Sequence, residues 1–173
     1  MADFSFLKPY VLTEAYVDAH YEEVQFLKHS FLPVPEARLA QAEEKLGFSL
    51  PEELKAFYYQ VGYGYLHQAQ ESSHNRLMYP LDVAAAYLRQ GKFENGYLAN
   101  IGLYEEPYKL LFYEAQQGCF AWLDLREKKP TSTVYYIGEA DKVADSIEAF
   151  LLAYEAQPTL LQEFSATSRA KLR

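Results

Sequence analysis

Cysteine is almost absent from this sequence, with Cys119 the one thiol among 173 residues. A single thiol cannot form an intrachain disulfide, so the fold must be held by its core. Residues 1–5 have neither the basic start nor the apolar run of a signal peptide. Apolar runs such as 83–88 and 149–154 are far shorter than the roughly 20 residues that cross a bilayer. We therefore expect a cytoplasmic protein without a membrane segment.

Basic residues are also scarce. The chain has 16 Lys and Arg against 24 Asp and Glu, which gives a formal net charge of −8. A nucleic-acid-binding protein needs basic side chains to neutralise phosphates, so the composition argues against a nucleic-acid partner. The same acidity is compatible with a basic protein as partner, because opposite charge accelerates association.

Motifs for catalysis and metal binding are missing. Gly62 and Gly64 lack the third glycine and the preceding strand of a dinucleotide-binding fingerprint. His67 and His74 have no cysteine or carboxylate at the spacing of a zinc site, and we interpret them as loop histidines. Cys119 lies in a predicted strand, and no histidine is placed to activate it as a nucleophile. We predict no catalytic residue, no metal and no cofactor.

The most specific local signal is a corner between two helices at residues 46–54. Pro35 suits the start of the first helix, and Gly47 stands where a helix end favours a left-handed residue. Pro51, or Ser49 with Glu52 at capping-box spacing, begins the second helix. We interpret Glu53, like the other carboxylates of these helices, as a solvated charge. The residues predicted to build the corner are Leu46, Gly47, Leu50, Pro51, Leu54 and Phe57.

Beyond the corner, the apolar pattern changes from helical to alternating near residue 97. Before it, helices are predicted at about 13–30 and 80–90, with a rigid connector at 31–35 and a loop at 62–76 that contains a short strand at 65–66. After it, short links between strands favour antiparallel pairing, and helices are predicted from 141 and from 159. The sequence therefore predicts an α+β fold, a single domain with helices packed against one antiparallel sheet of about four to six strands. The predicted strands are 98–104, 108–114, 119–125 and 133–137.

The ordered set of motifs resembles the SUKH superfamily. The pieces are Leu-Gly and Leu-Pro at 46–51, Leu-Met-Tyr-Pro-Leu at 77–81, the strand at 120–125, and the strand and helix at 134–151. Residues 62–65 read Gly-Tyr-Gly-Tyr, where the family often has an Asn-Gly-type turn. The resemblance implies a lead-in and helix at 1–33, a SUKH-like domain at 34–156, and a C-terminal helix or tail at 157–173 packed as part of the same domain.

This superfamily includes fungal cell-wall (glucan) synthesis regulators and bacterial immunity proteins of toxin systems. The resemblance implies a non-catalytic protein-binding domain, an immunity-type protein that binds and occludes a cognate toxin. A basic nuclease toxin would suit the acidic charge. The alternative is a regulatory interaction module in cell-wall synthesis or signalling. An enzyme that acts on sugars through tyrosines and carboxylates is a third interpretation.

Tyrosine is unusually frequent, with 16 residues. A tyrosine offers flat apolar area and a hydroxyl, which suits a binding surface. Two groups are therefore candidate partner contacts, and the alternative for each is a solvated rim. The loop group is Tyr63, Tyr65 and His67, and the strand-end group is Tyr104, Glu105 and Glu106.

Overall fold

The computed structural model describes residues 2–67, 74–94, 104–116, 118–137 and 142–162. Within them, seven strands form one sheet whose order follows the chain, and every neighbouring pair is antiparallel. The predicted α+β fold with an antiparallel sheet is confirmed, although seven strands exceed the predicted four to six. The strands are β1 (His29–Leu32), β2 (Tyr63–Leu66), β3 (Arg76–Leu77), β4 (Lys109–Gln116), β5 (Cys119–Asp124), β6 (Val134–Tyr136) and β7 (Lys142–Ala144).

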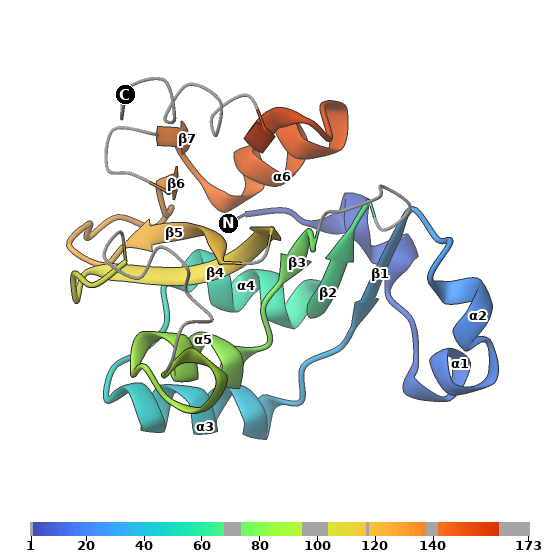
Figure 1. Cartoon of the computed structure of the whole chain (residues 1–173), viewed down its shortest axis with the longest axis horizontal. Helices are drawn as coiled ribbons and strands as arrows, with labels where there is room; N and C mark the ends of the chain where they lie inside the picture. Colours follow the sequence, from blue (N-terminus) through green and yellow to red (C-terminus); the bar gives the residue numbers. More distant parts are fainter. Residues whose placement is uncertain (1, 68–73, 95–103, 117, 138–141, 163–173) are drawn as a thin grey trace.

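Helices lie on both sides of the sheet and at one end of it. In Figure 1, α6 lies above the sheet, α3 and α5 lie below it, and α1 and α2 lie beside β1 at the end of the sheet. No helix of the described ranges has the length and apolar character needed to span a lipid bilayer. The helices are η1 (Ser5–Tyr10), α1 (Glu14–Ala19), α2 (Tyr21–Val24), α3 (Glu36–Leu46), α4 (Glu52–Gln60), α5 (Pro80–Tyr87), η2 (Gly91–Phe93) and α6 (Ile147–Ala156).

The short strands β1 and β7 were not predicted, and β2 begins earlier than the short strand predicted at 65–66 within the 62–76 loop. β1 occupies residues assigned to the end of a helix and to a connector, and β7 occupies residues assigned to the start of the helix predicted from 141. That helix begins later, at Ile147, where the Ser146 hydroxyl accepts the N–H of Ala149. Strands of three or four residues show too few alternations to be distinguished from a helix by spacing. The strand predicted at 98–104 lies, apart from Tyr104, outside the described residues.

The corner between α3 and α4 has the predicted geometry. Gly47 has a φ of 75°, and the helix α4 begins directly after Pro51. The four apolar corner residues Leu46, Leu50, Leu54 and Phe57 are buried. The ring of Phe57 contacts Phe4 from the N-terminal segment and Phe31 from β1. The corner therefore anchors the N-terminal segment and the first strand to the core.

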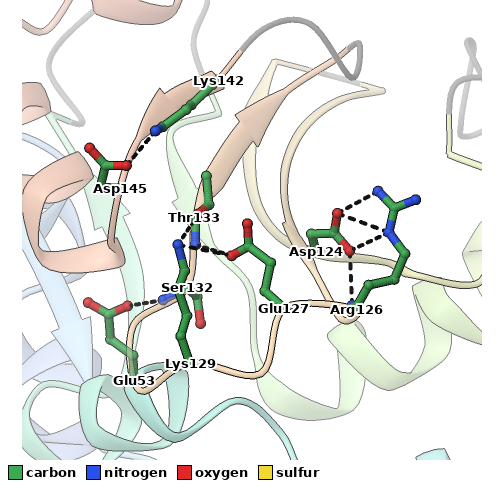
Figure 2. Close-up of polar contacts among 9 residues, drawn as sticks. All are labelled: Glu53, Asp124, Arg126, Glu127, Lys129, Ser132, Thr133, Lys142 and Asp145. Carbon is green, nitrogen blue, oxygen red and sulfur yellow. Dashed lines mark hydrogen bonds and ion pairs between the residues drawn. The ribbon is translucent and has the colours of Figure 1, made fainter.

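Glu53 is not the solvated charge that the sequence pattern suggested, because its side chain is buried with 3% exposure. Its carboxylate accepts the backbone N–H of Ser132 at 2.7 Å and the N–H of Glu148 at 3.1 Å. Figure 2 shows Glu53 pointing at Ser132, in the loop before β6 where Glu127 accepts the N–H of Thr133. One carboxylate thus connects the start of α4 to this loop and to the start of α6.

We predict that Leu54→Ala lowers the free energy of unfolding by about 2–5 kcal/mol, because it truncates a fully buried side chain of the corner. Gly47→Val should also destabilise, since Gly47 has a positive φ that a β-branched residue disfavours. Chemical denaturation would measure both changes. Unchanged transitions in both variants would contradict the proposed role of the corner.

We also predict that Glu53→Ala lowers the free energy of unfolding by about 2–4 kcal/mol, because two N–H groups lose a charged acceptor. The matched control is Glu52→Ala at the neighbouring position, whose side chain is exposed and paired with Lys55. That control should change stability by less than about 1 kcal/mol. Equal effects of the two variants would show that the Glu53 contacts do not contribute as argued.

Candidate functional site

A groove of about 590 Å³ lies between the α1–α2 segment and the end of the sheet formed by β1 and β2. Apolar and aromatic side chains provide most of its lining. Eight of its twelve lining residues precede position 33: Leu12, Val17, Tyr21, Val24, Gln25, Ser30, Phe31 and Leu32. The other four are Tyr63, Gly64, Tyr65 and His74.

The floor of the groove is one face of the β1–β2 ladder. Leu32 pairs with Tyr63, and Ser30 pairs with Tyr65, so these four side chains share a face. The ladder brings the two backbones very close, because a Cβ on Gly64 would lie only 2.1 Å from the carbonyl oxygen of Ser30. This close approach explains why the chain has glycine at this position.

The wall of the groove is the α1–α2 segment, residues 13–27. Thr13 caps α1 by accepting the N–H of Tyr16 with its hydroxyl. Val24 is buried under the segment, whereas Tyr21 and Phe26 are 73% and 75% exposed. The segment contains four carboxylates and no Lys or Arg, so its outer surface is acidic: Glu14, Asp18, Glu22 and Glu23 are all exposed.

Of the first predicted contact group, Tyr63, Tyr65 and His67, the structure places only the two tyrosines in the groove. Tyr63 is half-buried and Tyr65 is 42% exposed, and both line the groove. Burial, together with the nearby Tyr79 and Glu14, raises the pKa of Tyr63. His67, by contrast, is buried at the end of β2, so its side chain does not offer a surface to a partner in this conformation.

The second predicted contact group is divided in the same way. Tyr104 is buried, and its hydroxyl accepts the N–H of Phe120 at 2.9 Å, so it serves the core. Glu105 is exposed, and Glu106 pairs with Lys109 at 2.8 Å, which lowers the pKa of Glu106. Both carboxylates line a smaller hollow of about 150 Å³. The smaller hollow has fewer exposed aromatic residues than the groove, which makes the groove the better candidate.

Spacing along the sequence gave no sign of a polar cluster that joins His67 to His29 and Glu155. Nε2 of His29 lies 2.7 Å from Oε2 of Glu155, and Nε2 of His67 lies 3.3 Å from the same oxygen. Lys28 also pairs with the Glu155 carboxylate. The cluster connects β1, the end of β2 and α6. The sequence gave no signal for it because its members come from three distant segments.

The cluster has the residue types of a metal site, and its three ligand atoms lie within 4.8 Å of one another. However, Nδ1 of His29 accepts the backbone N–H of His67 at 3.1 Å. In a neutral imidazole with an accepting Nδ1, the proton lies on Nε2, which here faces Glu155. A metal at Nε2 requires that proton to be absent, and metal-bound histidines normally donate from the other nitrogen. This geometry favours a polar connection over a metal site, and the expectation of no metal stays a prediction.

Burial sets the charge states in this cluster. Burial lowers the pKa of His29 and of His67, and this effect outweighs the attraction of Glu155. Burial opposes ionisation of Glu155 as well, but Lys28 and His29 together hold the pKa of that carboxyl below its usual value. At neutral pH, the cluster therefore consists of two neutral rings around an ionised carboxylate that Lys28 balances.

We predict that the protein loses stability as the pH falls below 6.5, the ordinary pKa of histidine. Below that pH, the unfolded chain binds protons that the folded rings resist, which costs up to about 1.4 kcal/mol per pH unit for each histidine. The loss ends once the pH has passed through the lowered folded pKa values. Denaturant unfolding between pH 8 and 5 measures the slope.

In this experiment, His67→Gln should flatten the pH dependence, because one of the two contributing rings is removed. His74→Gln is the matched control, since His74 is exposed and lies outside the cluster. It should keep the wild-type slope. If His67→Gln also keeps that slope, the buried cluster is not the source of the pH dependence.

Comparison with known proteins adds two findings. The sequence pattern of the SMI1 / KNR4 family (SUKH-1) matches residues 33–153. "Immunity protein YxxD" of Bacillus subtilis (strain 168) is 30% identical to this chain over 130 residues, which is 74% of this chain and 84% of that protein. The family match begins directly after β1 and includes both floor tyrosines of the groove. The chain belongs to the SMI1 / KNR4 (SUKH-1) family.

Proposed function

We propose that this protein is a non-catalytic, immunity-type protein that binds a cognate toxin in the cytoplasm and neutralises it by covering the toxin's functional surface. The observation that carries this proposal is the likeness to Immunity protein YxxD, which extends over 74% of this chain and 84% of that relative. Similarity over most of both chains is what a shared binding role requires, because it preserves the scaffold that presents the contact surface.

Occlusion suits the physical properties of the described residues. It requires complementary shape and charge but no bond-making group. The groove supplies apolar area, and the net charge of −8 favours a basic partner. A nuclease toxin must grip phosphates with basic residues, so an acidic inhibitor would associate with it quickly.

The buried titratable groups of the described segments serve the fold. Glu53 accepts two backbone N–H groups, and His29 and His67 both contact the carboxylate of Glu155 in α6. Tyr113 and Tyr154 both donate to the side-chain oxygen of Asn75 in the core. These interactions support a binding role over a catalytic one, since each group is engaged away from the groove.

We predict that co-expression of this protein restores growth to cells that express the toxin encoded beside its gene. The two purified proteins should form a complex on size-exclusion chromatography, and the affinity should fall as the salt concentration rises. A toxin from an unrelated system is the control and should remain toxic. Continued toxicity and no complex with any neighbouring gene product would favour a regulatory module in cell-wall synthesis or signalling.

A further inference from the structure

Most of the exposed aromatic side chains of the described residues lie in the groove or on the segment that forms its wall. Of the six large hydrophobic side chains exposed in the described parts of the chain, Tyr16, Tyr21 and Phe26 lie on the α1–α2 segment, and Tyr65 lies on the groove floor. A cluster of this kind leaves apolar area in water, which is a feature of interaction sites rather than of ordinary surface. Tyrosine and phenylalanine are also the residue types that are enriched in the cores of protein interfaces.

We infer that this groove is the docking surface for the toxin, and that it takes an exposed segment with an apolar side chain flanked by Lys or Arg. The inference rests on the proposed function and adds the site and the chemistry of the contact. The apolar side chain would enter between Val17 and Tyr65, and the basic side chains would meet the acidic α1–α2 segment.

Charge complementarity selects a basic segment as the occupant. Glu14, Asp18, Glu22 and Glu23 are exposed along residues 13–27, where no Lys or Arg balances them. The next basic residue, Lys28, pairs with Glu155 of α6. An acidic partner segment would therefore meet like charge along the whole wall, whereas a basic one would be attracted.

The extent of the exposed surface favours a protein segment over a small ligand. The volume of about 590 Å³ would accommodate either, and a mostly apolar lining with a few polar groups is common to both kinds of site. Tyr16 and Phe26, however, are exposed on the α1–α2 segment although they do not line the groove. A partner with an extended surface could cover the groove together with these rings and the acidic side chains of the segment.

Binding of groove variants to the toxin domain encoded beside the gene tests the inference. Tyr21→Ala and Tyr65→Ala should each raise the dissociation constant by about tenfold or more, because they remove central aromatic anchors. Tyr59→Ala is the matched control, since Tyr59 is 62% exposed on α4 but does not line the groove. It should bind as the wild type does.

A charge reversal tests the acidic wall separately. Glu22→Lys should slow association and weaken its dependence on salt. Glu44→Lys makes the same change in net charge at an exposed position of α3, which lies away from α2 in Figure 1. That control should have a smaller effect. Equal effects of the two reversals would overturn the role of the wall.

Hydrogen exchange of the wild-type protein locates the contact surface without relying on any variant to fold. The complex should show slower exchange in residues 13–32 and 63–66 than the free protein does. The wild type could bind the toxin and restore growth while the slowed exchange lies outside these residues and the groove variants bind as their controls do. That result would overturn the docking site and leave the proposed function standing. If the wild type neither binds nor rescues, both fail. A dimer of this chain that Tyr21→Ala disrupts would assign the groove to a second copy instead.

Discussion

The pairing of β1 with β2 positions both the floor of the groove and part of the core. A Cβ on Gly62 or Gly64 would lie about 2 Å from a carbonyl oxygen of β1, so the two backbones can approach only because both residues are glycine. Since side chains alternate across a strand, this ladder has two different faces. One face carries Phe31 into the core against Phe57, and the other carries Leu32 and Tyr63 to the groove. The core and the candidate site therefore depend on the same pairing.

Two carboxylates hold the elements around this ladder in place. Glu53 joins α4 to the loop before β6 and to the start of α6, and Glu155 joins the far end of α6 to β1 and β2 through His29 and His67. The helix α6 is thus fixed at both ends by polar contacts, while Tyr154 packs against Tyr113 between them. Glu53 is buried and Glu155 is partly exposed, so a loss of partners is more costly at Glu53, and both sets of contacts fix the position of α6.

The parts of the structure that the sequence predicted are those whose cause is local. The corner could be predicted because Gly47 and Pro51 act on their own backbone, and the β4–β5 hairpin because two apolar runs flank a short link that ends at Gly118. β1 could not be predicted, because its four residues follow a segment with helical apolar spacing and are too few to show an alternating pattern of their own. Tyr63 and Tyr65 were chosen as exposed tyrosines of a loop, and the structure places both in the groove. The burial of His67 could not be predicted, because Glu155 and His29 approach it only after folding.

The division of the groove between two parts of the chain has a consequence for partner choice. The floor tyrosines lie within residues 33–153, which the family pattern covers, whereas eight of twelve lining residues and the whole acidic wall precede them. The α1–α2 segment contributes little to the core, since Val24 is its one buried residue. Substitutions on its exposed face would alter charge and aromatic contacts without a cost to the fold. A family member built in this way could change its partner through a short segment while the sheet and its supporting helices stay constant.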